Sequence, residues 1–207
     1  MEYVKIPNIF KREEYGSNKL IEGQYSTPEL EFLSDMLWEW TEKVDGTNIR
    51  VMWDGHSVTF GGRTDKAQIP AHLVNKLNEL FGGTNKEEIF EQKFGETPVI
   101  LFGEGFGAKI QKGGGLYGPV DFILFDVFIG GMWLKREDVE DIARTFNIRC
   151  VPIVGAGCLK DAVEYVRTHP MSRLRDAELE GIVCRPIVEL MDRRGSRIIV
   201  KIKCRDF

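Results

Sequence analysis

The sequence predicts an α+β fold built mainly on antiparallel sheet, and three observations support this class. Helix-like and strand-like segments are mixed without the regular strand–helix–strand alternation of a parallel sheet. Asp54-Gly55 separates two strand-like runs, which is a good hairpin signal. Two strand-like segments joined by a charged turn end the chain. At 207 residues we expect a single domain over residues 1–207, with no separate C-terminal domain.

Local patterns define the first elements. Ser26, Thr27 and Pro28 are expected to open a helix, with Glu29 three residues after Ser26 as in a capping box. An alternating segment at residues 38–42 then predicts a strand that arrives at Lys43. Further strands are expected at residues 48–53, 58–60, 99–104 and 122–128.

Later helices are expected where apolar residues recur at helical spacing. Such segments are residues 73–81, ended by Gly82, residues 139–146, and residues 162–166 before Pro170. Thr84 and Glu87 are expected to cap a short helix that follows residues 73–81. Strands at residues 181–188 and 197–203 complete the prediction.

Composition narrows the class of protein. No apolar run approaches the length of a membrane span, and the N-terminus lacks the apolar stretch of a signal peptide, so we expect a soluble, cytoplasmic protein. The net charge of −4 excludes a general polyanion binder, and contact with nucleic acid would need a local basic patch. The four cysteines form no zinc-like pattern, which favours buried free thiols.

The segment Lys43-Val44-Asp45-Gly46 indicates a lysine that becomes covalently loaded with a nucleotide. A lysine amine attacks the α-phosphate of a nucleoside triphosphate when it is neutral and held close to the phosphorus. The sequence supplies a carboxylate two positions on, a glycine that lets phosphate approach the backbone, and the polar Asn48. Alone the pattern is weak, because Asp and Gly are also favoured in turns.

Five further segments follow Lys43 in order. They centre on Arg63, Glu104, Phe125-Asp126, Glu180-Gly181-Ile182-Val183 and Lys201-Ile202-Lys203. Lys201 and Lys203 are two apart in a predicted strand, so both point to one face, where they repel unless an anion such as a triphosphate lies between them. Crowding by cations and partial burial also favour the neutral amine that Lys43 needs.

In this order the motifs resemble the signature of covalent nucleotidyltransferases, the polynucleotide ligases and messenger-RNA capping enzymes. That signature is K-x-D-G, a G-E pair, an aromatic-Asp strand, E-G-[IVL]-V and K-x-K, and here it spans Lys43 to Lys203. Thr47-Asn48, the spacing of Arg63, and Phe102-Gly103-Glu104 followed by Ile110-Gln111-Lys112-Gly113 resemble the RNA ligase 2 family, the phage-type RNA-repair ligases.

The resemblance implies an ATP-dependent RNA ligase that seals 5′-phosphate and 3′-hydroxyl RNA ends through lysyl-AMP, with Mg²⁺ or Mn²⁺. The implied catalytic residues are Lys43, Glu180, Lys201 and Lys203. The implied ATP-binding residues are Glu42, Lys43, Asn48, Arg63, Glu104, Phe125, Lys201 and Lys203. The implied RNA-binding residues are Asn48, Arg63 and Asp126, and the implied metal-binding residues, acting through water, are Asp45, Asp126 and Glu180.

Other interpretations stay open on the sequence. A DNA ligase, a GTP-using capping-type enzyme or a non-catalytic RNA-binding relative would carry similar motifs. Phe125 also suits a core, and Lys201 and Lys203 also suit the solvated face of an edge strand. The lysines beside the triple glycine, Lys109 and Lys112, suit either a contact to phosphate or RNA or a polar loop. The family generally continues into a further domain, so we expect an isolated catalytic domain or a minimal enzyme.

Overall fold

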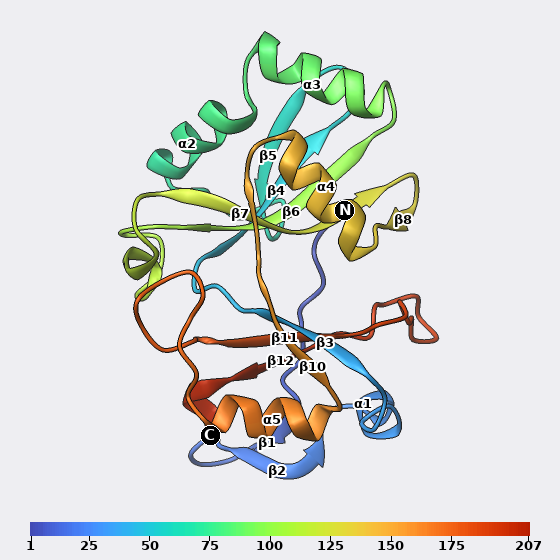
Figure 1. Ribbon diagram of the computed structural model, residues 1–207, viewed down its shortest axis with the longest axis vertical. Helices are drawn as coiled ribbons and strands as arrows, with labels where there is room; N and C mark the ends of the chain where they lie inside the picture. The colour runs from blue at the N-terminus through green and yellow to red at the C-terminus, as the bar shows by residue number, and fades with distance from the viewer. The chain divides into compact units, whose positions relative to one another are not determined.

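The computed structural model describes residues 1–207, and the chain divides into two compact units (Figure 1). Unit 1 comprises Met1–Tyr3 and Val44–Val151, and unit 2 comprises Val4–Lys43 and Pro152–Phe207. The division therefore falls inside the K-x-D-G segment, directly after Lys43. None of the five α-helices combines the length and the apolar character needed to cross a bilayer.

Unit 1 contains a six-stranded sheet in the order β5-β4-β6-β7-β8, with β9 beside β7. Its strands are β4 (Thr47–Trp53), β5 (Val58–Gly62), β6 (Val99–Phe106), β7 (Asp121–Ile129), β8 (Met132–Trp133) and β9 (Arg149–Cys150). Every pairing is antiparallel except that of β7 with β9. The predicted Asp54-Gly55 hairpin joins β4 to β5.

Three helices cover this sheet and close the core of unit 1 (Figure 1). They are α2 (Ala71–Phe81), α3 (Thr84–Phe94) and α4 (Arg136–Thr145). Apolar side chains of the helices pack with those of the strands, among them Leu73, Leu77, Phe81, Phe90, Ile49, Leu101, Phe122, Leu124 and Phe146. The prediction that Thr84 caps α3 is wrong: Gly83 is the N-cap, and no side chain caps this helix.

Unit 2 contains a four-stranded antiparallel sheet in the order β10-β3-β11-β12, with a separate β1-β2 pair. Its strands are β1 (Phe10–Arg12), β2 (Leu20–Tyr25), β3 (Trp38–Glu42), β10 (Ile153–Gly157), β11 (Gly181–Pro186) and β12 (Val200–Lys203). Its helices are α1 (Pro28–Phe32) and α5 (Leu159–Arg167). Figure 1 shows α5 lying along one face of the sheet, where Leu159, Ala162, Val163 and Val166 join the core.

The capping box predicted at Ser26 is wrong, because the N-cap lies one residue later and Leu30 rather than Glu29 is then the third helical residue. The N-cap of α1 is Thr27, whose side chain accepts from the N–H of Leu30 at 3.4 Å. The Ser26 hydroxyl instead donates to the carbonyl oxygen of Asn8 at 2.5 Å. Competition from this tertiary hydrogen bond decides which of two adjacent hydroxyl residues caps the helix.

The predicted α+β class with mainly antiparallel sheet is confirmed. Segments predicted as strands at residues 38–42, 48–53, 99–104 and 122–128 are strands, while β12 begins at Val200 rather than near residue 197. The sequence missed β1, β2, β10 and the two-residue strands β8 and β9. All four cysteines are free thiols; Cys184 and Cys204 are buried as predicted, whereas Cys150 and Cys158 are only partly buried. Burial raises the pKa of the Cys184 thiol well above its ordinary value.

Candidate active site

Unit 2 brings four predicted site residues to one end of its sheet. Lys43 directly follows β3, and Glu180 directly precedes β11. Since β3 and β12 both run antiparallel to β11, their final residues lie beside the start of β11, and Lys203 pairs with Gly181. The N–H of Lys43 donates to the carbonyl oxygen of Gly181 at 2.9 Å. The main chain of the candidate nucleophile is therefore fixed to the sheet.

The Glu180 carboxylate lies between two of the lysines. Its Oε2 is 2.9 Å from Lys43 Nζ, and its Oε1 is 3.3 Å from Lys203 Nζ. The side chains are 16% exposed for Glu180 and Lys203 and 23% for Lys43, so solvent screens these pairs less than it screens surface ion pairs. One carboxylate thus faces two ammonium groups, which leaves an excess of positive charge.

Lys201 adds a third cation, and the structure shows at this residue the effect expected of crowded lysines. Partial burial, followed by repulsion from the ammonium groups of Lys203, Lys43 and Lys5, lowers the pKa of Lys201 from 10.5 to about 8. Glu180 opposes this shift only in part. Cations arranged in this way lack negative charge, which a bound phosphate would supply.

The edge-strand interpretation of these lysines accounts for only part of the geometry. β12 is at the edge of its sheet, as that interpretation requires. The outer backbone of Lys201 is nevertheless covered, because its N–H donates to Pro7 and its carbonyl accepts from Ile9. Neither Lys201 nor Lys203 is exposed, whereas a purely solvated face would leave both side chains in water.

Gly181 allows Glu180 and Lys203 to come together. A Cβ at position 181 would lie 2.2 Å from the carbonyl oxygen of Ile202 and 2.8 Å from the Cα of Lys203. Contacts this short are not tolerated, so a side chain here would push β12 away from β11. The glycine of the E-G-I-V segment is needed for strand packing at the site.

Glu42, predicted to bind ATP, directs its carboxylate to the loop that follows α5. The residue is 2% exposed and accepts hydrogen bonds from the Ser172 hydroxyl and from the Arg173 N–H, the latter at 2.9 Å. The Ser172 oxygen also accepts from the N–H groups of Leu174 and Arg175. Glu42 therefore organises this loop, and its contact with ATP stays a prediction.

In unit 1, Asn48 and Glu104 are direct neighbours on β4 and β6. Both are partly buried, and Asn48 Oδ1 is a buried acceptor without a hydrogen-bond partner. An unsatisfied buried oxygen is unfavourable, so it marks a place where a ligand donor fits. The pair therefore offers oxygen acceptors suited to sugar hydroxyl groups.

Gly46 packs closely against β6. A Cβ at this position would lie 2.3 Å from the carbonyl oxygen of Gly105 and 2.8 Å from Cγ of Glu104. The glycine therefore lets the chain pass closely over β6. That it also lets a phosphate approach the backbone stays a prediction.

Asp45, predicted as a metal ligand, contacts the glycine-rich segment of unit 1. Its Oδ2 accepts from the N–H of Gly113 at 3.0 Å, and its own N–H donates to the Tyr117 hydroxyl at 3.2 Å. The contact joins residues 68 positions apart in the chain. Asp45 is therefore more than a local turn residue.

Phe125 and Asp126 lie at an irregularity of β7. Phe102 pairs with Asp126 and Gly103 with Leu124, so Phe125 is the extra residue of a bulge. The partly buried Phe125 ring meets Tyr3 edge-on, with ring centroids 5.1 Å apart. Asp126 is fully buried and accepts from the Tyr3 hydroxyl at 2.5 Å. Sequence reasoning missed Tyr3, because nothing local links it to a residue 123 positions away.

Arg63 follows β5 and is exposed, as a residue that meets a large substrate would be. Its loop is held by Arg50, which is 2% exposed and was also missed. The Arg50 guanidinium donates to the carbonyl oxygens of Gly62 and Met1 at 2.7 and 3.0 Å and to Asp65 Oδ1 at 2.8 Å. A buried arginine thus fixes the backbone on both sides of Arg63.

The carboxylates do not form a ready-made metal cage. No group of three His, Cys, Asp or Glu side chains is placed to hold an ion. Mg²⁺ commonly keeps several waters and uses only one or two carboxylates. Oε2 of Glu180 is buried and, apart from its ion pair with Lys43, makes no hydrogen bond, so it suits a water held by such an ion.

The basic residues near the C-terminus separate into different environments. Arg193 and Arg194 are exposed in the turn between β11 and β12. Arg197 is 7% exposed and forms a two-pronged ion pair with Glu189, at 2.6 and 2.8 Å. Arg197 is therefore an internal support of this turn rather than part of a solvated or phosphate-binding surface.

Comparison with known proteins gives one family and one fold. A family model described as RNA ligase matches residues 36–203. A Naegleria gruberi RNA ligase mutant with ATP and Mn has a TM-score of 0.66 at 17% identity, over 98% of this chain and 60% of that one. Naegleria gruberi RNA ligase with pyrophosphate has a TM-score of 0.63 at 21% identity, over 85% and 52%. The chain thus spans a little over half the length of these proteins, and the likeness establishes a shared fold. No curated protein gave a match.

Proposed function

Because the chain belongs to the RNA ligase family, we propose that it is an ATP-dependent RNA ligase, or the nucleotidyl-transfer portion of one. The observation that carries the proposal is the group of Lys43, Glu180 and the two β12 lysines at one end of a sheet. Two of the similar structures support the use of ATP and a divalent ion. One is an RNA ligase with ATP and Mn, and the other is an RNA ligase with pyrophosphate.

In the first step Lys43 Nζ attacks the α-phosphorus of ATP. A nitrogen–phosphorus bond forms, the bond to the β-phosphate oxygen breaks, pyrophosphate leaves, and the amine proton passes to solvent. Lys201 and Lys203 bind the α-phosphate oxygens and stabilise the charge that develops on them. The lowered pKa of Lys201 supports this role, since a phosphate would relieve the repulsion that causes the shift.

The residues of unit 1 bind the nucleoside. Glu104 and Asn48, side by side on β6 and β4, accept hydrogen bonds from the ribose or orient it. Phe125 stacks on the adenine, an interaction worth roughly 1–3 kcal/mol per base. Arg63 contacts phosphates of ATP or RNA from its fixed loop. Asp126 is fully buried against Tyr3, and its binding of RNA or of a metal ion stays a prediction.

A divalent ion, Mg²⁺ or Mn²⁺, supplies charge neutralisation at the reacting phosphate. Glu180 would hold such an ion through a water molecule, for which its buried Oε2 offers an acceptor. Because the same carboxylate pairs with Lys43, it also holds the amine before ATP binds.

Two further transfers complete the ligation. AMP moves from Lys43 to the 5′-phosphate of an RNA, which regenerates the amine and forms a phosphoanhydride. The 3′-hydroxyl of a second RNA end then attacks the activated phosphate, forms the phosphodiester and releases AMP. The positive end of the unit 2 sheet serves each step, because every step places charge on a phosphate.

The first test is formation of the covalent adduct. With ATP and Mg²⁺ the protein should gain the mass of one AMP, and tandem mass spectrometry should place it on Lys43. Lys43→Ala should gain none, while replacement of the exposed Lys160 by alanine should leave the gain unchanged. No adduct with any nucleotide and metal would contradict the proposal.

The second test identifies nucleotide and nucleic acid. Labelled ATP should form the adduct and labelled GTP should not, which separates a ligase from a capping-type enzyme. Nicked duplexes with RNA at the 3′-hydroxyl side should be sealed in preference to all-DNA nicks. RNA binding without AMP transfer would instead indicate a non-catalytic relative.

A further inference from the structure

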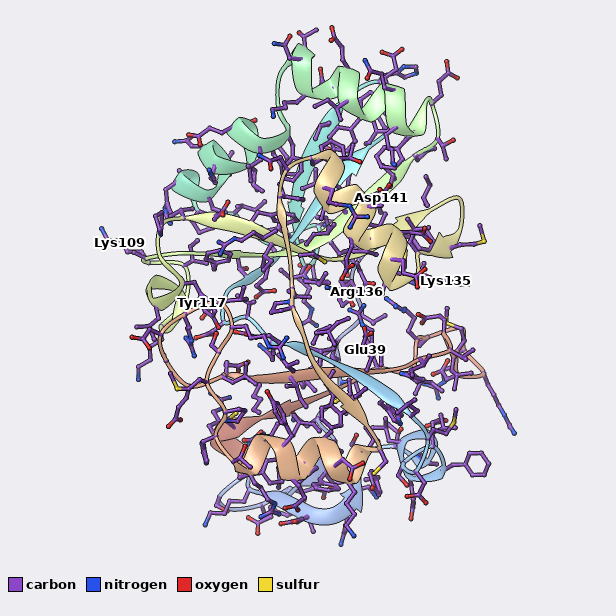
Figure 2. All side chains as sticks on the ribbon, viewed as in Figure 1. Glu39, Lys109, Tyr117, Lys135, Arg136 and Asp141 are labelled. Atoms are coloured by element: carbon purple, nitrogen blue, oxygen red, sulfur yellow. The ribbon has the colours of Figure 1, made fainter.

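The segment from Gly107 to Gly118, called here the glycine loop, has a charge unlike that of the whole chain. Its only charged residues are Lys109 and Lys112, in a protein whose net charge is −4. Both lysines are exposed. Figure 2 shows Lys109 at the outer side of the loop, extending away from unit 1. Exposed cations on a loop without negative charge suit contact with a large polyanion. They suit a small ligand less well, because such a ligand is usually enclosed in a pocket.

The glycine loop is compact, because its glycines pack closely. A Cβ on Gly107 would lie 2.7 Å from Cα of Val120, and one on Gly114 would lie 2.7 Å from the carbonyl oxygen of Gly107. The N–H of Gly114 donates to Gln111 at 3.1 Å. These approaches bring the two ends of the loop together and define where its lysines emerge.

Asp45 anchors the middle of this loop at two points. Its Oδ2 accepts from the N–H of Gly113, next to Lys112, and its N–H donates to the hydroxyl of buried Tyr117. The Tyr117 ring in turn packs against Phe106 of β6, with centroids 5.5 Å apart. The contacts tie the loop to the chain that follows the candidate nucleophile.

Chain connectivity places this anchor close to the chemistry. Asp45 is two residues after Lys43, so about 7 Å at most separates their Cα atoms in any arrangement of the two units. The anchor of the glycine loop is therefore adjacent along the chain to the lysine proposed to carry AMP.

We propose that the glycine loop binds the RNA backbone through Lys109 and Lys112, and that Asp45 is the positioning residue that holds the loop in place. This inference rests on the proposed ligase function and assigns to Asp45 a mechanical role in place of metal binding. The ligand is a phosphodiester chain, and the phosphates of ATP are the other source of the same chemistry.

The first experiment replaces both loop lysines by alanine and measures binding of a fluorescent nicked RNA duplex as salt rises. Two lost phosphate contacts reduce the slope of log affinity against log salt by about 1.8. Between roughly 50 and 200 mM salt, wild-type affinity should therefore fall about 12-fold more than that of the variant. The charge-matched control, Lys11→Ala with Lys160→Ala, changes two exposed lysines and should retain the wild-type slope.

The same variants separate the two sources of phosphate. If the loop binds RNA, the Lys109→Ala/Lys112→Ala protein forms the Lys43–AMP adduct at the wild-type rate and seals RNA poorly. Loss of adduct formation with normal RNA binding would overturn the assignment and indicate ATP phosphates. A slope equal to that of the control would also overturn it. Wild-type protein that forms no adduct would instead contradict the proposed function itself.

The second experiment tests Asp45 through coupling. Asp45→Asn keeps an acceptor for Gly113 and should bind RNA nearly as wild type, with an unchanged Mg²⁺ requirement for adduct formation. Asp45→Ala releases the loop, so adding the two lysine substitutions to it should weaken RNA binding by less than they do alone.

Additive effects would show that Asp45 does not act through the loop, and a raised Mg²⁺ requirement in Asp45→Asn would show a metal ligand. Tyr117→Phe removes only the hydroxyl that meets the Asp45 N–H, so it provides a milder test if Asp45→Ala does not fold. Tyr117→Phe should also reduce the effect of the lysine substitutions on RNA binding, and full additivity there would overturn the proposal.

Discussion

Raising the pH through 8 should weaken nucleotide binding, because Lys201 then loses its proton. Burial and neighbouring lysines lower the pKa of Lys201 to about 8 in the nucleotide-free protein. A bound triphosphate favours the charged amine and so raises this pKa. The affinity for nucleotide is therefore highest below about pH 8 and falls above it. About one pH unit above the free pKa, only about a tenth of Lys201 is protonated, which weakens binding about tenfold.

The assay measures equilibrium binding of an ATP analogue in which a methylene group replaces the oxygen between the α- and β-phosphates. Wild-type Lys43 can then be kept, because the analogue cannot form the AMP adduct. Binding is measured from about pH 7 to 9.5. Protonation of the ligand is avoided in this range, since phosphate groups lose their second proton at about pH 6. Lys201→Arg keeps a permanent charge at the position and should flatten the profile across this range. Lys160→Arg, at an exposed site on α5, should keep the wild-type profile.

Two results would refute this reasoning. Wild-type affinity that stays constant up to about pH 9.5 would show that the charge of Lys201 does not contribute to nucleotide binding. A profile for Lys201→Arg that falls as steeply as the wild type would show that a different group titrates.

Three further outcomes are expected. In Gly181→Ala the new Cβ would lie 2.2 Å from a carbonyl oxygen of β12. This variant should lower the free energy of unfolding by about 1–3 kcal/mol and slow adduct formation. In the control Gly115→Ala the Cβ would have no neighbour nearer than 3.6 Å, so neither stability nor adduct formation should change. Tyr3→Phe leaves the buried Asp126 carboxylate without its hydroxyl donor, so urea titration should show a loss of about 1–3 kcal/mol, and an unchanged midpoint would contradict the assigned hydrogen bond. EDTA should stop adduct formation yet leave the thermal midpoint unchanged, because no three-ligand metal site supports the fold; a large fall in the midpoint would reveal a structural ion.

The sequence predicted the central strands because their signals are local. Alternating apolar residues and the Asp54-Gly55 turn define β4 and β5 without reference to the rest of the chain. β10 lacks such a signal, since Gly155, Ala156 and Gly157 follow only two apolar residues. The reason for its composition is tertiary: a Cβ on Gly155 would lie 2.7 Å from the Trp40 ring. A strand shaped to fit a distant tryptophan does not show a strand pattern.

The site residues, like the strands, were predictable only in part. Motif order identified Lys43, Glu180 and Lys203, and the structure joins these three by ion pairs. The hydrogen-bond partners of other site residues are backbone atoms or distant side chains, which leave no pattern in the sequence. The N–H of Gly113 that binds Asp45 is one, and the Tyr3 hydroxyl on Asp126 is another. Residue type shows what chemistry a side chain offers, and only the fold shows which partner it meets.

The K-x-D-G segment combines chemistry with mechanical attachment. The Lys43 N–H donates to the carbonyl oxygen of Gly181, which fixes the candidate nucleophile to the sheet of unit 2 beside Glu180. Three residues later, Gly46 packs against β6 in unit 1 at a distance that excludes any side chain. Only Val44 and Asp45 separate these two attachments, and Asp45 also holds the glycine loop. This four-residue segment therefore combines a lysine attached to unit 2 with a carboxylate and a glycine attached to unit 1.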